Sequence, residues 1–332
     1  MGTVTEMITL REPVVTSHAQ FLIDMAARAP SVHNSQPWRF RIGPSTIEVH
    51  CDKQRKLRTD ILGRDMLISC GAALFGLRLG VRSLGYLPVV QLLPDPTRPH
   101  LVAQVGTGAS APVTGEENRM LQAVPYRHTH RGPFEPGPLP DGLLRGLRDD
   151  ALAEGATLAL VKENAAYQRL AGIVAAAADH LYLDPRTQEE TRRWTRDADS
   201  LVRDGVSAQT FAATAAGHPG RLTQRDFDLG RGLAQLPTGG ESPAATAVLL
   251  TPGENWVEWL RAGQALHRVL LHAASKRVFA SLYSQPLELP ATRALIRDRL
   301  ALPGNPQMLL QLGCANIGEP TARRPADELI DA

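Results

Sequence analysis

The chain has 332 residues, of which 43% are hydrophobic, so it can bury one substantial core or two related cores that share an interface. Its formal net charge of +2 is too small for a general nucleic-acid or membrane binder, and local arginine clusters instead indicate a discrete anion. The three cysteines lie far apart without a zinc pattern, and we recognise neither a bilayer-spanning apolar run nor a signal peptide, so we expect a cytoplasmic protein.

The first predicted element is a helix that begins at Ala19. Apolar side chains recur there at the spacing of one buried helical face, and Thr16 or Ser17 is available as the N-cap. Pro30 disfavours helical backbone at the preceding residue and so ends the helix. Two stretches of alternating apolar residues follow and predict a hairpin.

The turn between this helix and the first strand is rich in small polar residues. Its side chains include Pro30, Ser31, His33, Asn34 and Gln36. Backbone donors and acceptors stay unpaired in such a turn, and together with the small side chains they suit a planar heteroaromatic ligand. An ordinary loop before a strand is the alternative.

Two later parts of the chain share a weak repeat. The first copy is expected to form a helix and two strands, over residues 71–83, 89–94 and 101–106. The second copy is expected to repeat this order, over residues 263–275, 287–290 and 308–313. The helices are expected to start at glycine, at Gly71 and at Gly263.

A second candidate site lies between the two copies, where residues 127–131 hold two arginines, a hydroxyl and two imidazoles. The planar forks of Arg127 and Arg131 suit phosphate oxygens, with each charge-assisted bond worth roughly 1.5–3 kcal/mol. A solvated basic loop is the alternative. His128 and His130 could ligate a metal, but the arginines would repel a cation, so we expect no metal.

Two other motifs point to different chemistry and are weak. Residues 106–111 have a GxGxxA form, but Pro112 and polar residues follow where a dinucleotide fold needs an apolar helix. Ser31 near His33 lacks the GxSxG context of a serine hydrolase.

The turn and the arginine cluster together resemble the nitroreductase superfamily of FMN enzymes. The flavin-lining pattern Pro-Ser-x-x-Asn-x-Gln-Pro-Trp is matched by Pro30, Ser31, Asn34, Gln36, Pro37 and Trp38. The phosphate motif Arg-x-Ser-x-Arg is matched by Arg127, Thr129 and Arg131. With Arg28 before the turn and an Arg-Arg-Pro sequence near the end, the chain most closely resembles the Acg family of nitroreductase-like flavoproteins.

The resemblance implies an α+β nitroreductase-like fold made of two pseudo-repeated halves. The halves are expected at residues 14–113, which carry the turn, and 114–332, which carry the phosphate arginines. Superfamily members usually form dimers with FMN at the interface, so this chain is expected to be a monomer that mimics such a dimer and holds one FMN. A lid-like insertion is expected at 186–243, with a helix around 194–202.

The resemblance also implies where FMN is bound. The backbone near Ser284 and Gln285 is expected to face the reactive N5 atom, and Arg323 or Arg324 to reach back to the phosphate. The complete set of expected cofactor-binding residues is Arg28, Pro30, Ser31, His33, Asn34, Gln36, Arg127, His128, Thr129, Arg131, Ser284, Gln285, Arg323 and Arg324.

The implied activity is that of an oxidoreductase. NADH or NADPH would pass hydride to FMN, which would reduce a nitro compound, a quinone or a similar small-molecule acceptor. No side chain in the motifs is an obvious general acid, so no catalytic residue is named. The alternative is a flavoprotein that sequesters or senses FMN under a closed lid, with little turnover.

Overall fold

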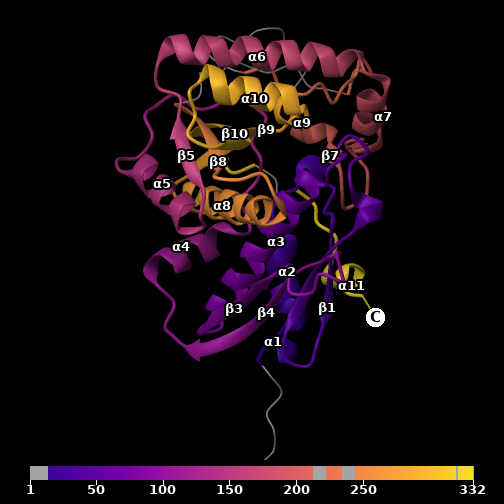
Figure 1. Cartoon of the computed structure of the whole chain (residues 1–332), viewed down its shortest axis with the longest axis vertical. Coiled ribbons are helices and arrows are strands. Elements are labelled where there is room, and N and C mark those ends of the chain that lie inside the picture. The colour runs from indigo at the N-terminus through magenta and orange to yellow at the C-terminus, as the bar shows by residue number, and fades with distance from the viewer. Residues whose placement is uncertain (1–13, 212–221, 234–243, 319–320, 332) are drawn as a thin grey trace, which may run out of the picture.

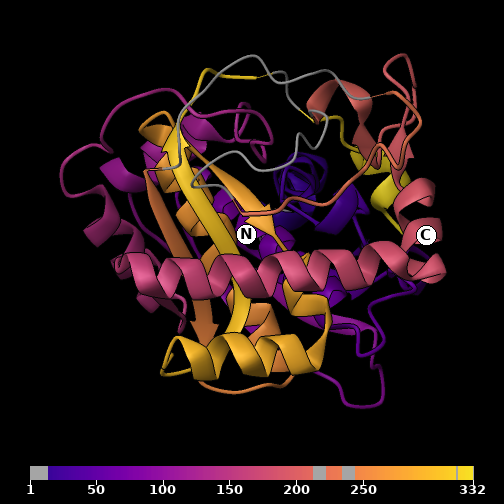
Figure 2. The same cartoon turned by 90° about the horizontal axis from the view of Figure 1, so that it is seen from above.

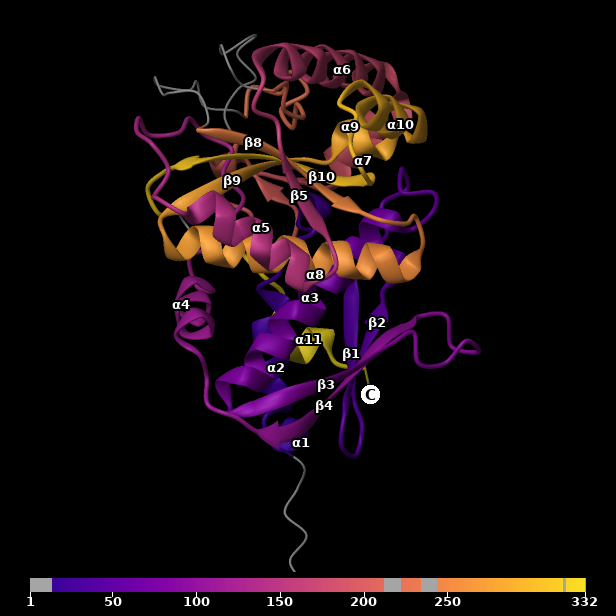
Figure 3. The same ribbon diagram turned by 60° about the vertical axis from the view of Figure 1, so that its left-hand side comes forward.

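We describe the chain from a computed structural model, over residues 14–211, 222–233, 244–318 and 321–331. Two four-stranded antiparallel sheets lie at either side of two long helices, α3 and α8 (Figure 1). Seen from the side, the first sheet, the helices and the second sheet stack as layers, and further helices cover the outer face of the second sheet (Figure 3). The fold is therefore of the mixed α/β kind that was expected.

The first sheet lies in the N-terminal part of the chain and has the strand order β1-β2-β4-β3. The predicted helix and the hairpin of β1 and β2 are confirmed. The N-cap of α2 is His18 rather than Thr16 or Ser17, because a single helical turn already occupies those two residues. The elements of this part are α1 (Val14–Ser17), α2 (Ala19–Ala27), β1 (Trp38–Ile42), β2 (Ile47–Cys51), α3 (Arg64–Ser83), β3 (Tyr86–Leu92) and β4 (Leu101–Ser110).

The second sheet has the order β5-β8-β10-β9, which repeats that of the first sheet when the strands are taken in sequence. In each sheet a long helix joins the second strand to the third. The elements are α4 (Gly115–Ala123), α5 (Leu143–Ala153), β5 (Thr157–Leu160), α6 (Asn164–Leu183), α7 (Pro185–Arg193), β6 (Thr195–Arg196), β7 (Val206–Ser207), β8 (Ala245–Thr251), α8 (Trp256–Ser275), β9 (Val278–Tyr283), α9 (Gln285–Glu288), α10 (Pro290–Arg299), β10 (Asn305–Cys314) and α11 (Ala326–Leu329).

The third strand of the second sheet does not lie at residues 287–290, where the repeat predicts a strand. It is β9 that follows α8, whereas residues 287–290 end one short helix and begin the next. Pro286 and Pro290 stand in the first turns of these helices, where the missing N–H of proline costs no hydrogen bond.

A long segment, residues 161–244, separates β5 from β8, whereas β1 and β2 are joined by a short turn. Its helix α6 lies beside α10 over the outer face of the second sheet (Figures 1 and 2), where side chains of both helices share one hydrophobic cluster with Val248 and Leu250 of β8. The added segment thus begins before the expected boundary at residue 186. The helix expected around residues 194–202 is wrong, because α7 ends at Arg193 and β6 follows. Residues 212–221 and 234–243 of the predicted lid lie outside the described chain.

Helices α3 and α8 approach each other most closely at two glycines. A Cβ atom on Gly71 would lie 2.2 Å from the carbonyl oxygen of Leu260, and one on Gly263 would lie 1.9 Å from that of Ile68. These glycines therefore permit backbone contact between the helices. They do not start the helices, each of which begins about two turns earlier than expected.

Helix α3 also corrects the expectation about apolar runs. By length and composition alone it could cross a membrane, but 83% of its apolar stretch is buried inside the molecule. Burial of this kind is typical of a core helix. Its side chains belong to the main hydrophobic core, which also includes residues of α2, α8 and both sheets.

We expect Gly263→Ala to destabilise the fold strongly. The added methyl group would overlap the backbone of α3, which cannot move aside as a flexible side chain would, so we expect a loss of roughly 3 kcal/mol or more in the free energy of unfolding. Denaturant unfolding monitored by circular dichroism measures this loss.

The matched control is Gly172→Ala in α6. Among the described residues, no atom outside the local backbone of α6 lies within 4 Å of a Cβ placed on Gly172, so this substitution should stabilise the helix by roughly 0.5–1 kcal/mol. Equal changes in the free energy of unfolding for the two substitutions would show that α3 and α8 do not cross at these glycines.

Candidate functional site

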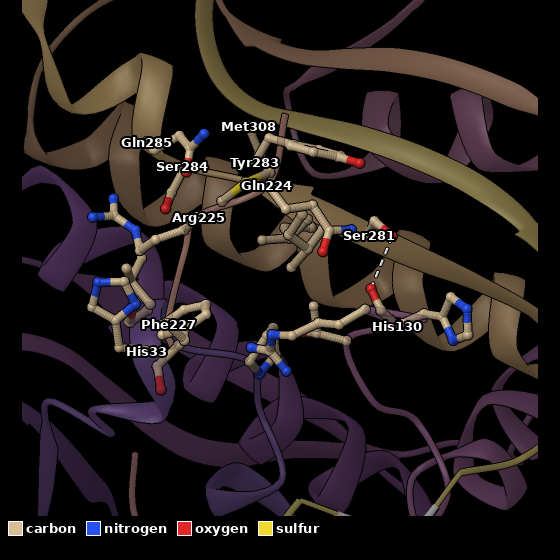
Figure 4. A pocket seen from close by; sticks show the side chains of 18 of the residues that line it. His33, His130, Gln224, Arg225, Phe227, Ser281, Tyr283, Ser284, Gln285 and Met308 are labelled. Carbon is tan, nitrogen blue, oxygen red and sulfur yellow. Dashed lines mark hydrogen bonds between the residues drawn. The ribbon is translucent and has the colours of Figure 1, made fainter. Parts of the chain in front are cut away.

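A cavity lies between the turn after α2, helix α3 and the second sheet (Figure 4). The space within its walls is about 860 Å³, which includes space open to solvent. The predicted site residues that line it are Pro30, Ser31, His33, Thr129, Arg131, Ser284 and Gln285. The fold thus brings together the turn, the arginine cluster and the expected N5-facing segment, which are far apart in the sequence.

The turn has an unusual backbone. His33 and Asn34 have φ of 53° and Gln36 has φ of 49°, all in the left-handed region. Strained conformations of this kind cluster at ligand sites. The turn is fastened by Ser31, whose Oγ accepts a hydrogen bond from the backbone N–H of Gln36 at 3.0 Å.

His33 contributes a buried ring to the cavity wall. It packs edge-on against Phe227, with ring centroids 5.4 Å apart, and both rings lie near Arg225 in Figure 4. Burial, and then the charges of Arg225 and Arg131, lower the pKa of His33 well below its ordinary value. The ring is therefore neutral at physiological pH.

The side chains of Asn34 and Gln36 contact other parts of the chain. Asn34 Nδ2 donates to the carbonyl oxygens of Gly205 and Ala322, each at 3.1 Å. Gln36 Nε2 donates to the carbonyl of Arg203 at 2.8 Å, and Gln36 Oε1 accepts from the backbone N–H of Arg324 at 2.9 Å. Neither side chain lines the cavity. These bonds hold the inserted segment and the C-terminal tail against the turn, and the expected contact of Asn34 and Gln36 with a ligand stays a prediction.

The predicted phosphate arginines gather beside the cavity. Arg127 is buried, and one of its Nη atoms donates to the carbonyl of Arg28 at 3.2 Å, while Arg323 donates to the carbonyl of Ala29 at 3.1 Å. The charges of Arg127, Arg28 and Arg131 all act on Arg323. In the described chain, none of these four arginines forms a salt bridge.

Without a bound anion, the burial of these positive charges is energetically unfavourable. Burial lowers the pKa of Arg127 and of Arg131 to about 10, and burial with the neighbouring cations lowers that of Arg323. The Nε and one Nη of Arg127 and the Nε of Arg323 are buried and have no hydrogen-bond partner among the described residues. Buried, unpaired guanidinium groups are costly, so an anion beside them would be stabilising.

The two remaining members of the predicted arginine and histidine sets make other contacts. Arg324 turns toward Glu328, to whose backbone carbonyl it donates at 2.8 Å. His128 packs against Phe279, with ring centroids 4.5 Å apart, and does not line the cavity. Its Nδ1 lies 3.0 Å from the carbonyl of Tyr126.

The arginine segment is held in place by the edge of the second sheet. Thr129 forms a parallel bridge with Ala280 of β9, and the backbone N–H of His130 donates to the Ala280 carbonyl at 2.9 Å. The Ser281 hydroxyl donates to the carbonyl of His130 at 2.8 Å, drawn as a dashed line in Figure 4. Arg131 therefore faces the cavity from a fixed strand-like segment.

Ser284 and Gln285 follow β9 directly and lie at the upper wall of the cavity in Figure 4. The Ser284 hydroxyl donates to the buried carboxylate of Glu288 at 3.3 Å, and Gln285 Nε2 donates to the carbonyl of Thr223 at 2.8 Å. Glu288 also pairs with Arg225. This wall thus joins β9 to the inserted segment.

The inserted segment supplies cavity residues that sequence reasoning missed. Phe211, Gln224, Arg225 and Phe227 all line the cavity. They lie in a stretch without clean periodicity, so no local pattern marked them. Only the aromatic residues of this stretch could have indicated that it is buried. Aromatic side chains in an irregular polar stretch usually pack against another part of the protein.

No family model matches the chain. A Mycobacterium tuberculosis protein named "Putative NAD(P)H nitroreductase Rv3131" is 32% identical over 324 residues, covering 93% of this chain and 90% of that protein. Another from the same organism, "Putative NAD(P)H nitroreductase acg", is 29% identical over 323 residues, covering 96% of each.

The solved structures that match are more distant. A nitroreductase with bound FMN from Desulfitobacterium hafniense is 14% identical with a TM-score of 0.42, covering 65% of this chain and 98% of its own. The FMN-dependent nitroreductase NfnB from Mycobacterium smegmatis, in complex with NADPH, is 15% identical with a TM-score of 0.40, covering 64% and 96%. The family assignment rests on the sequence relatives, which span nearly the whole chain. The chain belongs to the nitroreductase superfamily, within the Acg family of nitroreductase-like proteins.

Proposed function

We propose that the chain binds one FMN in the cavity and acts as an NAD(P)H-dependent oxidoreductase on a nitro compound, a quinone or a similar small acceptor. The observation that carries the proposal is the cluster of Arg28, Arg127, Arg131 and Arg323, which has no acidic partner in the described chain. A phosphate group with about two negative charges would neutralise part of this cluster and pair its free N–H groups.

The residues present fit FMN in two further respects. Arg131 lines the cavity together with Ser281, Ser284 and Gln285, so a cation and small polar groups face the same space. His33 and Phe227 offer ring edges and faces for a planar ligand. A flavin needs this combination of a charged end and a flat, mostly apolar slot.

Bound FMN would accept a hydride from NADH or NADPH and pass electrons to the acceptor. The chain's part is to bind, orient and exclude water. Arg127 and Arg131 would anchor the phosphate, and the backbone at Ser284 and Gln285 would face the reactive edge of the ring. Phe211 and Phe227 would keep water from that edge.

We propose that the chain is an internal mimic of a dimer, with halves at residues 14–113 and 114–332. The equal strand order of the two sheets and the crossing of α3 and α8 at corresponding glycines support this. The C-terminal tail also crosses to the first sheet, where Ile330 bridges Phe40. Only the first half carries the turn and only the second carries Arg127 and Arg131, which supports a monomer with one site.

A cytoplasmic location is also a proposal. Its support is that the buried thiols of Cys51 and Cys70 lie 3.7 Å apart without a disulfide, as in a reducing compartment.

Sequestration or sensing of FMN is the second candidate function, and the inserted segment favours it. Besides lining the cavity, this segment is fastened to the turn through Asn34 and Gln36, and Asp204 pairs with Arg55. We propose that it acts as a lid. A lid held by buried hydrogen bonds slows the entry of both NAD(P)H and acceptor.

Rapid mixing of the yellow protein with NADPH and with NADH separates the two functions. Bleaching of the flavin absorbance within seconds, followed by recovery on addition of a quinone or nitro compound, supports the oxidoreductase. Stable yellow colour over minutes with both nucleotides would overturn the enzymatic proposal and leave sequestration.

A further inference from the structure

Arg225 is a charged side chain that the inserted segment brings to the cavity. It is partly buried, lines the cavity, and lies beside His33 and Phe227 in Figure 4. The cluster of four arginines proposed for the phosphate does not include it. A guanidinium that lines a cavity outside the phosphate cluster is a candidate for binding a second ligand.

The carboxylate of Glu288 fixes the position of this guanidinium. Nη2 of Arg225 donates to Oε1 of Glu288, and the Ser284 hydroxyl donates to the same oxygen at 3.3 Å. Arg225 therefore lies within two hydrogen bonds of Ser284, whose backbone is expected to face the reactive edge of the flavin. A donor in this place can reach the space in which an acceptor must bind to receive electrons.

The remaining N–H groups of Arg225 are available to a ligand. Within the described chain, its Nε and Nη1 form no hydrogen bond, and Glu288 is its only acidic partner. The nearby ring of His33 is neutral and adds no charge, because burial and then the charges of Arg225 and Arg131 lower its pKa. A guanidinium is planar, so a carboxylate that holds one N–H group also fixes the direction of the others.

Arg225 and Glu288 together carry one charge of each sign. Burial raises the pKa of Glu288, and the charge of Arg225 is the strongest influence that lowers it, so the carboxylate keeps its charge through this pair. The donors of Arg225 therefore face the cavity without a net positive charge. Such a site suits an uncharged oxygen, as in a quinone or a nitro group, better than a carboxylate or a sulfonate.

We propose that Arg225 is a recognition residue for the electron acceptor, and that its available N–H groups bind an uncharged carbonyl or nitro oxygen. The acceptor class is then neutral quinones and nitroarenes. This inference rests on the proposed oxidoreductase function. It gives the inserted segment a part in substrate specificity, which the first half cannot duplicate because only a short turn joins β1 to β2.

Binding and reoxidation of the FMN-loaded protein test this role, with 1,4-naphthoquinone as the probe. Its Kd is followed by the change in absorbance of the oxidised flavin, and Arg225→Met should raise this Kd about tenfold or more, as expected for a lost hydrogen bond to a charged group. Reoxidation of the dithionite-reduced protein by a low concentration of the quinone should slow by the same factor. Reoxidation by ferricenium, a one-electron oxidant without an oxygen or nitrogen acceptor, should be unchanged.

Glu288→Gln tests the charge balance of the pair. Glutamine leaves the guanidinium in the cavity without its negative partner, so the anion 1,4-naphthoquinone-2-sulfonate should gain about tenfold in affinity relative to naphthoquinone. The matched control is Arg186→Met, which removes an exposed arginine of the same segment outside the cavity. It should change neither Kd.

An unchanged Kd for naphthoquinone in Arg225→Met would overturn the inference. An equal change in reoxidation by naphthoquinone and by ferricenium would also overturn it, because Arg225 would then only dock the inserted segment. If Arg225→Met does not fold, Glu288→Gln decides alone, and an unchanged preference between the two quinones would contradict the assignment. A parent protein that holds no FMN, or whose reduced flavin is not reoxidised by a quinone or a nitro compound, would instead overturn the proposed function.

Discussion

Arg127→Met should weaken FMN binding by at least about 100-fold while the apoprotein remains as stable as the parent. Two charge-assisted hydrogen bonds to phosphate are lost, each worth roughly 1.5–3 kcal/mol. The folded apoprotein loses nothing comparable, because Arg127 is buried with two unpaired nitrogens and its pKa is lowered to about 10. Removal of an uncompensated buried cation can even raise stability.

Fluorescence titration of the apoprotein with FMN measures the affinity, and urea unfolding measures the stability. The matched control is Arg119→Met, which removes the same charge from an exposed position on α4 and should change neither quantity. A variant at Arg127 that binds FMN normally would move the phosphate site elsewhere. A variant that unfolds would indicate that the bond from this guanidinium to the Arg28 carbonyl is essential to the fold.

Gln36→Met should release the inserted segment from the turn. The Gln36 amide joins two distant chain segments through its bonds to the Arg203 carbonyl and to the Arg324 N–H. Methionine fills a similar volume but offers neither bond. Loss of two buried hydrogen bonds should speed local opening by roughly 10- to 100-fold.

Hydrogen exchange of the Gly205 amide reports this opening, since that amide donates to the Asn34 carbonyl beside Gln36. FMN release and reduction by NADPH should accelerate in the same variant. Gln168→Met on the exposed face of α6 is the control and should leave exchange at Gly205 unchanged. Unaltered exchange in Gln36→Met would refute the view that this amide holds the lid.

The parts of the site that could be predicted from the sequence are those encoded locally. The turn after α2 is a contiguous pattern, with Pro30 ending the helix and Ser31 fastening the backbone of Gln36. The arginine segment is equally compact, and Arg131 lines the cavity as expected. Local patterns of this kind depend on backbone preferences that the residues themselves impose.

The contacts of Asn34 and Gln36 join distant segments of the chain, which no local pattern reports. The amides of Asn34 and Gln36 bond residues more than 160 positions away.

The misplaced helix starts have a similar cause. The sequence pattern predicts that the helices start at Gly71 and Gly263, although glycine is a poor helix former in any position. In the folded chain each lies in mid-helix, where the absence of a Cβ permits the other helix to approach. The free energy gained by packing α3 against α8 outweighs the cost of placing glycine within a helix. This contact can be seen only in the tertiary structure.

The central claim is that one FMN binds per chain, with its phosphate at the arginine cluster. Calorimetric titration of the apoprotein with FMN and with riboflavin tests it most directly. We expect one FMN per chain and an affinity for FMN at least about 100-fold higher than for riboflavin, because riboflavin makes no charged contact with the arginines. Two FMN per chain, or equal affinity for the two flavins, would contradict the account.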